Sequence, residues 1–371
     1  MKHKVLVTGG AGFIGSFIVD ELIRNGHEVR IFDWLDPQVH GKSLPEYLNR
    51  EAEFMRGDIR KPEELLRAIQ DVDVIFHEAA AVGVGQSMYQ ISHYMNVNVM
   101  GTSHLLNLLV DKEHSVKKLI VAGSMSSYGE GSYKCPHCGI VYPELRTEAQ
   151  MAKGQWELFC PKCGRVAKPV PTSETKSLDS TSIYAISKKV QEEMVHSIGK
   201  AYGISTVSLR YFNVYGPRQS LSNPYTGVAA IFMSRLKNGN SPIINEDGLQ
   251  TRDFVSVHDI ARANLLAMES SSANHESFNV GSGKPISIKY LAEYLAKLYG
   301  VNIKPEIVFK YRKGDVRHCF ADISRIKSKL GFAPQVKFED GMKELVEWSR
   351  KVEAVDRYEQ AHKELKAKGL A

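Results

Sequence analysis

The sequence predicts an α/β fold built on a doubly wound parallel sheet, with a smaller C-terminal lobe and a four-cysteine insertion. Strand-like apolar runs alternate with helix-like runs from residue 5 onward, an order typical of parallel sheets covered by helices on both faces. A glycine-rich turn, TGGAGFIG, separates the first strand from the first helix. Two C-x2-C pairs interrupt the alternation between residues 131 and 176, where we expect a loop insertion.

Each predicted element follows from its local pattern. Short apolar runs indicate strands at residues 5–9, 29–33, 72–80, 117–124 and 205–210. Longer helix-favouring runs indicate helices at residues 13–26, 62–70, 97–110 and 184–202. After residue 219 the chain becomes richer in Asn, Pro, Gly and Ser, as expected where it leaves the sheet for a second lobe. The charged stretch from about residue 341 favours one or two solvated helices.

Composition excludes several classes of protein. The chain has 371 residues, 43% apolar and 24% charged, which favours an ordered protein large enough to form a cleft. The net charge of +6 is spread along the chain, so we expect no nucleic-acid partner. No apolar run reaches the ~20 residues that a membrane span needs. A strand begins directly after MKHK, so we expect no targeting segment and a cytoplasmic location.

The glycine-rich turn indicates a dinucleotide site. Gly9, Gly12 and Gly15 lack the Cβ atoms that would keep the backbone away from a pyrophosphate, whose charge the free N–H groups of the helix start can hold. Asp33 ends the second strand, where a carboxylate can bind an adenosine ribose and repel a 2′-phosphate, which favours NAD over NADP. Asp58 is a candidate for the adenine edge. The alternatives are a tight turn without a ligand and ordinary loop aspartates.

A tyrosine and a lysine in the segment YAISK indicate acid–base chemistry. Tyr184 and Lys188 are four residues apart, so on a helix they share one face, and an ammonium beside a phenol lowers the pKa of the phenol towards that of a general base. Ser124 ends a strand and can bind the same substrate hydroxyl. The alternative is that the tyrosine and the lysine are solvent-exposed side chains on a helix surface, with no catalytic role.

The two cysteine pairs indicate a metal site. CPHCG and CPKCG each place two sulfurs on a short turn, and four thiolates in tetrahedral geometry suit Zn²⁺, with iron as the alternative. The predicted ligands are Cys135, Cys138, Cys160 and Cys163. A filled four-thiolate site leaves no open position, so we expect a structural role. Because both ends of the insertion lie near catalytic segments, we expect it to form part of the cleft wall or a partner surface.

Together, TGGAGFIG, GSMSSYG and YAISK resemble the extended short-chain dehydrogenase/reductase family, in its NAD-dependent nucleotide-sugar epimerase and dehydratase branch. The resemblance runs from Lys4 to about Pro334 and omits only the insertion. It implies a Rossmann-type fold with Tyr184 as the base, Lys188 as its partner and Ser124 as the third catalytic residue. The cofactor contacts that it implies are Gly9, Gly12, Phe13, Ile14, Gly15, Asp33, Asp58, Ile59, Ala79, Ala80, Asn98, Tyr184, Lys188 and Phe212.

The same resemblance implies a nucleotide-diphosphate sugar as substrate and a homodimer formed through the helices that follow Asn98 and carry Tyr184. The segments RYFNVYGPRQ, TRDFVSVHDIA and YRKGDVR match family segments at the sugar and the nucleotide. The substrate contacts implied are Ser124, Asn213, Arg218, Arg252, Arg312 and Asp315. Arginine suits phosphate because its guanidinium donates paired hydrogen bonds. The alternative for each arginine is a structural ion pair.

On this resemblance the chain divides into four parts. We expect a NAD-binding domain at residues 1–134, 172–212 and 254–282, and the four-cysteine insertion at residues 135–171. A nucleotide-sugar-binding lobe is expected at residues 213–253 and 283–340, and a helical tail at residues 341–371.

The expected reaction is a 4-epimerisation through a transient 4-keto sugar. Dehydratases of the branch carry Asp and Glu directly after the catalytic residue, where this chain has Met125 and Ser126, and its decarboxylases carry a Glu nearby. The 3,5-epimerising reductases need a Cys and His pair, whereas Cys319 and His318 lie far along the chain, in a segment expected to pack the second lobe. The sequence is most similar to dTDP-L-rhamnose 4-epimerases, which make dTDP-6-deoxy-L-talose. The alternatives are a UDP-glucose/UDP-galactose 4-epimerase and, more remotely, a NAD-binding sensor or scaffold without turnover.

Overall fold

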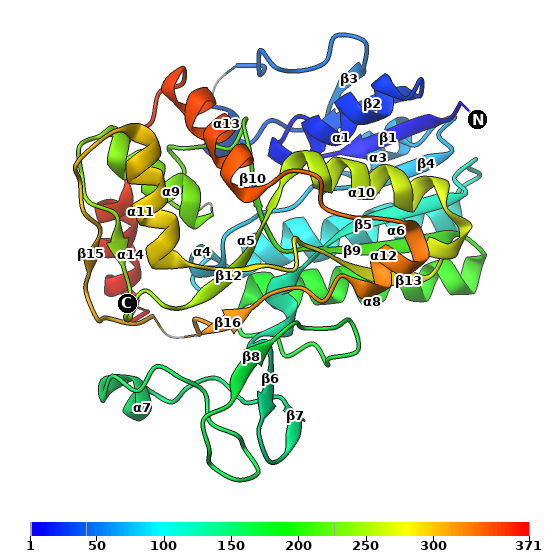
Figure 1. Cartoon of the computed structure of the whole chain (residues 1–371). Coiled ribbons are helices and arrows are strands. Elements are labelled where there is room, and N and C mark those ends of the chain that lie inside the picture. Colours follow the sequence, from blue (N-terminus) through cyan, green and yellow to red (C-terminus); the bar gives the residue numbers. More distant parts are fainter. Residues whose placement is uncertain (1, 42, 226, 313, 371) are drawn as a thin grey trace.

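The centre of the molecule is a seven-stranded sheet in which all neighbouring strands are parallel (Figure 1). The computed structural model describes residues 2–41, 43–225, 227–312 and 314–370. The strand order is β13 (Glu276–Val280), β9 (Ser205–Tyr211), β5 (Lys118–Ser124), β4 (Val74–His77), β1 (Lys4–Thr8), β2 (Glu28–Asp33) and β3 (Glu53–Arg56). This order reverses direction beside β1, which confirms the predicted doubly wound sheet and opens a crevice at the carboxyl ends of the strands.

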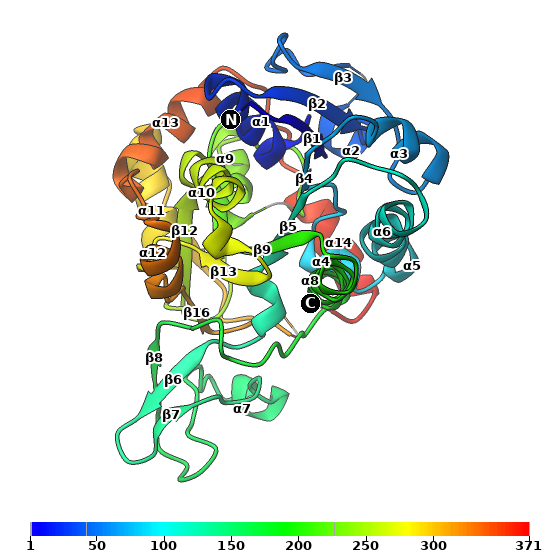
Figure 2. The same ribbon diagram turned by 90° about the vertical axis from the view of Figure 1, so that its right-hand side faces the viewer.

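Helices cover both faces of this sheet (Figure 2). One face packs against α1 (Phe13–Arg24) and α10 (Val257–Glu269), and the other packs against α3 (Pro62–Ala68), α6 (Gly101–Asp111) and α8 (Ile183–Tyr202). All seven residues of β5 are buried, as expected for a central strand covered on both sides. The two apolar layers therefore fix the sheet and leave its carboxyl edge free to carry a site.

The ends of α8 are set by local signals. Ser182 is the N-cap, and its hydroxyl accepts a hydrogen bond from the backbone N–H of Ala185 at 3.1 Å. Gly203 ends the helix in the left-handed conformation, with φ of 72°, which glycine adopts without steric cost. The helix therefore starts one residue before Tyr184, at the edge of the sheet where the strands end.

A second lobe lies beside the carboxyl edge and has its own apolar core. Its strands are β10 (Asn213–Tyr215), β11 (Ile243–Ile244), β12 (Thr251–Ser256), β14 (Pro285–Ser287), β15 (Glu306–Ile307) and β16 (His318–Cys319). Its helices are α9 (Val228–Lys237), α11 (Ile288–Tyr299), α13 (Phe338–Arg350) and α14 (Tyr358–Ala367). A further helix, α12 (Ser324–Leu330), packs against β13 of the main sheet.

The insertion projects from the body of the molecule below β16 (Figure 1). It contains a three-stranded antiparallel sheet, in the order β7 (Gly139–Val141), β6 (Ser132–Cys135) and β8 (Lys168–Val170). A single short helix, α7 (Glu148–Ala152), lies between the two cysteine pairs. The insertion core contains only a few apolar side chains besides the cysteines, so the insertion is too small to be held by apolar burial alone.

Some boundaries differ from the predicted ones. The strand predicted at residues 72–80 is shorter, because the chain leaves the sheet after His77 and residues 78–80 line a cleft instead. The helix predicted at residues 97–110 begins earlier, with the short helices α4 (Val84–Ser87) and α5 (Ile91–Tyr94) followed by a π-helical turn at Met95–Met100. Another short helix, α2 (Pro37–His40), follows β2. Within the part of the chain that is described, no helix combines the length and the apolar character needed to cross a bilayer.

Candidate active site

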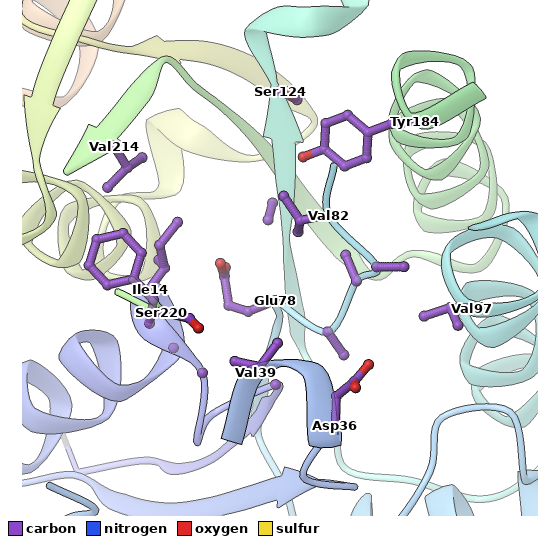
Figure 3. Close-up of a pocket in the computed structure, with 18 of the residues that line it drawn as sticks. Ile14, Asp36, Val39, Glu78, Val82, Val97, Ser124, Tyr184, Val214 and Ser220 are labelled. Carbon is purple, nitrogen blue, oxygen red and sulfur yellow. The ribbon is translucent and has the colours of Figure 1, made fainter. Parts of the chain in front are cut away.

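A cleft of about 390 Å³ lies at the carboxyl ends of β1, β2, β4, β5 and β9. Parallel pairing aligns these strand ends, so that Thr8 lies opposite His77 and Ser124 lies opposite Tyr211. Most of the predicted site residues line this cleft: Gly9, Gly12, Phe13, Ile14, Gly15, Asp33, Asp58, Ile59, Ala79, Ala80, Ser124, Tyr184, Lys188, Phe212 and Asn213. Segments far apart in the sequence therefore meet in one cavity (Figure 3).

The glycine-rich turn is packed too tightly for side chains. Gly9 has a φ of +70°, and a Cβ built on it would lie 2.7 Å from the backbone nitrogen of Ala79. A Cβ on Gly15 would lie 2.3 Å from the carbonyl oxygen of Gly9. Gly12, at the start of α1, provides no side-chain cap, so the first N–H groups of the helix can bind an anion. This geometry fits a bound dinucleotide pyrophosphate.

Asp33 joins the end of β2 to the glycine-rich turn. Its Oδ2 accepts a hydrogen bond from the N–H of Ala11 at 3.1 Å, and its Oδ1 accepts one from Leu35 at 2.9 Å. Burial raises the pKa of this carboxyl group, against the effect of its hydrogen bonds. The carboxylate still lines the cleft, and each oxygen can accept a further hydrogen bond from a ribose.

Asp58 lies at the same end of the cleft and is paired with Arg60. The Arg60 guanidinium donates to both carboxylate oxygens of Asp58, and its carbon lies 5.1 Å from the centre of the Trp34 ring. Trp34 and Arg60 also line the cleft, although neither was predicted. A planar cation over an indole ring gives this end of the cleft flat surfaces on which a base can stack.

Ser124, Tyr184 and Lys188 meet at the opposite end of the cleft. Ser124 is the last residue of β5, and its hydroxyl faces the Tyr184 phenol and influences its pKa. Burial raises the pKa of Tyr184, and the Ser124 hydroxyl counteracts that rise. Burial lowers the pKa of Lys188 to about 8, so the ammonium one turn away titrates close to neutral pH. The three groups can hold a substrate hydroxyl and remove its proton.

Asn98 lies behind the cleft and does not line it. Its side chain donates to the carbonyl of Ala81 at 3.1 Å and accepts from the N–H of Ala81 at 2.8 Å. The same side chain donates to the hydroxyl of Ser187 at 2.9 Å. Asn98 thus joins the loop after β4 to helix α8, from a π-helical turn of the kind often found at functional sites. Asn98 was predicted to contact the cofactor, and that contact remains a prediction; in the structure it holds the loop after β4 against α8.

Sequence reasoning missed the residue at the centre of the cleft. The Glu78 carboxylate points into the cavity between Ile14 and Tyr184 (Figure 3). It accepts a hydrogen bond from the Tyr211 hydroxyl, and burial raises its pKa to about 7. The available signal was the carboxylate in HEAA, directly after a strand. Glu78 is thus a third ionisable side chain beside the tyrosine and the lysine.

Three amide side chains form one wall of the cleft and were also missed. The Gln38 amide donates to Gln86 and to Asn223, both at 3.3 Å. These residues come from α2, α4 and the second lobe, and all of them line the cleft. No local pattern could have revealed them, because they are widely separated in the sequence.

Only two of the six predicted substrate residues line the cleft in the structure. Ser124 and Asn213 line the cleft, whereas Arg218, Arg252, Arg312 and Asp315 are not among the residues that line it. Arg218 forms an ion pair with Asp20 at 2.7 Å, and its guanidinium lies 4.3 Å from the centre of the Phe17 ring. Arg252 donates to the carbonyl oxygens of Thr251, Val316 and Arg317. Arg312 pairs with Asp315 at 2.9 Å. Their contact with a nucleotide remains a prediction.

The four predicted metal ligands converge in the insertion. All four sulfur atoms of Cys135, Cys138, Cys160 and Cys163 lie within 4.8 Å of one another, and Cys135 and Cys163 are 3.5 Å apart. A tetrahedral zinc with Zn–S bonds of ~2.3 Å places its sulfurs roughly 3.8 Å apart. The five cysteines are free thiols, so no disulfide competes for these ligands. The donor set therefore fits Zn²⁺.

The insertion does not form part of the cleft wall, contrary to one expectation. No described residue between 135 and 171 lines the cavity. Its anchors do lie near the segments that carry Ser124 and Tyr184, but the chain runs outward from β5 and packs against the second lobe. Cys319 is buried within the main apolar core, away from the cleft, so it does not form a catalytic pair with His318 there.

Comparison with known proteins identifies the relatives of this chain. The model of the NAD dependent epimerase/dehydratase family matches residues 5–144 and 161–281, and the gap between these ranges lies inside the insertion. The dTDP-L-rhamnose 4-epimerase of Burkholderia thailandensis is 36% identical over 93% of this chain and 94% of its own length.

Two solved structures show the same fold. The UDP-glucose 4-epimerase of Thermotoga maritima, solved with UDP-glucose, has a TM-score of 0.77 and 33% identity, covering 94% of this chain and 99% of its own. The UDP-glucose 4-epimerase of Thermus thermophilus, in complex with NAD, has a TM-score of 0.74 and 30% identity, covering 94% of this chain and all of its own (100%).

Proposed function

The chain belongs to the NAD-dependent epimerase/dehydratase family and is a nucleotide-sugar epimerase. We propose that it is a 4-epimerase that interconverts dTDP-L-rhamnose and dTDP-6-deoxy-L-talose. The observation that carries the proposal is the meeting of Ser124, Tyr184 and Lys188 in a cleft whose other end is shaped for a dinucleotide. The proposed cofactor contacts are the cleft residues of the glycine-rich turn, Asp33 and the loop after β4.

The chain's own side chains account for the proton chemistry. Tyr184, as phenolate, removes the proton from the hydroxyl at sugar C4, and the Lys188 ammonium stabilises that phenolate. Ser124 holds the same hydroxyl, because its own hydroxyl lies at the end of β5, next to the Tyr184 phenol. Bound NAD would supply the hydride acceptor and donor at C4. Tyr184 would return the proton to O4, so that a hydride delivered to the opposite face of C4 would give the epimer.

The residues after Ser124 favour epimerisation over dehydration or decarboxylation. Met125 and Ser126 carry no carboxylate, and the Ser126 hydroxyl is hydrogen-bonded to Ser124 at 2.8 Å. The carboxylate in the centre of the cleft, Glu78, accepts a hydrogen bond from Tyr211 and lies at the end of a different strand. Water elimination would need an acid and a base beside the catalytic serine, and these positions do not supply them.

The choice of sugar rests on similarity to the rhamnose epimerase. The second candidate is UDP-glucose/UDP-galactose 4-epimerisation, which the fold match to the Thermotoga maritima enzyme favours. Purified protein is incubated separately with dTDP-L-rhamnose and with UDP-galactose, and the products are identified by NMR. We expect dTDP-6-deoxy-L-talose from the first. Turnover of UDP-galactose alone would contradict the rhamnose assignment and leave the 4-epimerase assignment intact.

We also propose that the four cysteines hold a structural Zn²⁺, since their sulfurs converge and a filled four-thiolate site leaves no open position. Elemental mass spectrometry of preparations grown with zinc or with iron decides between the two metals. A site that needs four reduced thiols favours a reducing compartment such as the cytoplasm. The proposed homodimer would use α6 and α8, and light scattering of the purified protein tests it.

A further inference from the structure

The insertion contacts the second lobe through charged side chains. Arg146 of the insertion forms two parallel hydrogen bonds to Glu246, with Nη1–Oε2 and Nη2–Oε1 distances of 2.7 and 2.9 Å. Its Nη2 also donates to the backbone carbonyl of Asp315 at 3.1 Å. The side chains of Arg146 and Glu246 are almost fully excluded from solvent, with exposed fractions of 0% and 3%. A bidentate, buried pair of this kind fixes both partners in orientation.

A second insertion residue reaches the same place. Glu157 accepts hydrogen bonds from Arg317 at 2.6 and 3.1 Å and contacts the His318 ring at 3.3 Å. Arg317 is fully buried and also pairs with Glu246 at 2.9 Å and with Asp247 at 2.7 Å. Two arginines of different segments thus share one glutamate. We call the set Arg146, Glu157, Glu246, Asp247 and Arg317 the charged cluster.

The charged cluster is connected to the residues predicted to bind the nucleotide. The backbone carbonyls of Val316 and Arg317 accept hydrogen bonds from the Arg252 guanidinium at 2.7 and 3.1 Å. The Thr251 hydroxyl hydrogen-bonds the His318 ring at 2.8 Å. The insertion therefore holds the side chain of Arg317, while the backbone of the same segment positions Arg252. Arg146 also donates to the carbonyl of Asp315, so the Arg312–Asp315 pair is connected to the charged cluster as well.

We propose that the metal-bound insertion is a clamp that positions Arg252 and the segment 314–318 for the diphosphate of the nucleotide sugar, with Arg146 and Glu157 as its positioning residues. The inference rests on the proposed function, because the substrate class comes from there. It explains why the insertion, which contributes nothing to the cleft lining, carries a buried arginine aimed at the second lobe. Neither residue touches the reacting atoms, so their effect is on substrate binding and not on the chemical step.

Steady-state kinetics of Arg146→Met and Glu157→Gln test the clamp. The substrate is whichever of dTDP-L-rhamnose and UDP-galactose the wild-type protein turns over. We expect KM to rise about tenfold in Arg146→Met, with a smaller rise in Glu157→Gln, and kcat to remain within about twofold of wild type. Lys153→Met and Glu144→Gln are matched controls on exposed positions of the same insertion, and both should leave KM unchanged. Metal content and bound NAD are measured in each variant and should equal those of wild type. An unchanged KM in Arg146→Met and Glu157→Gln overturns the clamp, as does a fall in kcat at constant KM.

Hydrogen exchange tests the clamp without any variant and without turnover. Wild-type protein is compared before and after the metal is removed with a chelator. We expect faster amide exchange at residues 314–318 and 251–252 after removal, with exchange in the glycine-rich turn unchanged. Equal exchange at 314–318 in the two samples overturns the clamp. If wild type turns over none of the nucleotide sugars, the proposed function fails, whereas the exchange result still decides whether the insertion orders this segment.

Discussion

The Tyr211 hydroxyl donates a hydrogen bond to Glu78 at 3.0 Å, which holds a carboxylate in the cleft that Tyr184 and Lys188 also line. Tyr211 is held in turn by the side chain of Asn264, whose amide donates to its hydroxyl at 2.8 Å. Burial in this cleft raises the pKa of Glu78 to about 7, while the nearby Lys188 ammonium and the Tyr211 hydrogen bond oppose the rise. The cleft therefore contains a carboxyl group that titrates near neutral pH.

Glu78→Gln should stabilise the cofactor-free protein at pH 8 but not at pH 4.5. The pKa of Glu78 is higher in the folded state than its ordinary value of 4.5, so the folded state binds more protons between pH 4.5 and about 7. Wild-type stability is therefore lost as the pH rises through this window, and glutamine, which keeps an acceptor for Tyr211, removes the loss. The gain at pH 8 is at most about 3 kcal/mol. Urea unfolding of both proteins at the two pH values measures this gain in the free energy of unfolding. An equal difference between variant and wild type at pH 8 and pH 4.5 would refute the raised pKa of Glu78.

Tyr184→Phe should slow epimerisation strongly and leave the binding of NAD and of the nucleotide sugar intact. Loss of the general base lowers kcat by about 10²–10⁴-fold, while phenylalanine keeps the ring contact with Tyr94. Turnover and the affinities for NAD and the nucleotide sugar are measured together. Tyr202→Phe, an exposed tyrosine on the same helix, is the matched control and should behave as wild type. Unchanged turnover in Tyr184→Phe would instead favour a protein that binds NAD without catalysis.

Asp33→Asn should weaken NAD and reduce the discrimination against NADP. The carboxylate that would bind the adenosine ribose loses its charge, so we expect the Kd for NAD to rise about tenfold, whereas the repulsion of a 2′-phosphate disappears. Asparagine can still accept one of the two backbone hydrogen bonds of Asp33. Titration calorimetry with both cofactors gives the two affinities. Asp36→Asn is the control: it removes a nearby charge and should keep the preference for NAD over NADP. If Asp33→Asn also kept the full preference for NAD, the Asp33 carboxylate would not select the cofactor.

Cys135→Ser should lose the metal and lower the melting temperature by about 5 °C, because the insertion core is too small to stay folded without it. The kcat at saturating substrate should change much less, since the insertion does not line the cleft. Elemental analysis, calorimetry and kinetics are run on the same preparation. Cys319→Ala, at the fifth cysteine, should retain the metal. A Cys135→Ser protein with wild-type stability but no turnover would contradict a structural role.

Local patterns carried most of the fold and about half of the site. Several features are encoded within a few neighbouring residues, because a turn, a helix face or a pair of metal ligands imposes its own short spacing. These features are the glycine-rich turn, Asp33, the Tyr184–Lys188 pair and the two cysteine pairs. The strand end at Ser124 was predictable for the same reason, and the first strand ends at Thr8, one residue before its predicted end. Their meeting at one edge followed from the parallel sheet.

Contacts between distant segments were not predictable in this way. Glu78 and Tyr211 are separated by 133 positions, and Gln38 and Asn223 by 185, so only the packed chain brings them together. The sequence predicts that Arg252 contacts a ligand, but only the fold shows which backbone carbonyls, those of Thr251, Val316 and Arg317, orient its guanidinium. A guanidinium binds whichever acceptors the fold provides, and its sequence context does not state which these are.

By itself, the sequence determined a doubly wound sheet, a glycine-rich turn after the first strand, a tyrosine and a lysine on one face of a helix, and four clustered thiols, since each depends on the geometry of a short segment. The tertiary structure decided which groups share the cleft, how burial shifts the pKa values of Glu78 and Lys188, and that the insertion contacts the second lobe and not the cavity. The reason is physical: burial and long-range ion pairing depend on the whole packed chain, and no local spacing encodes them.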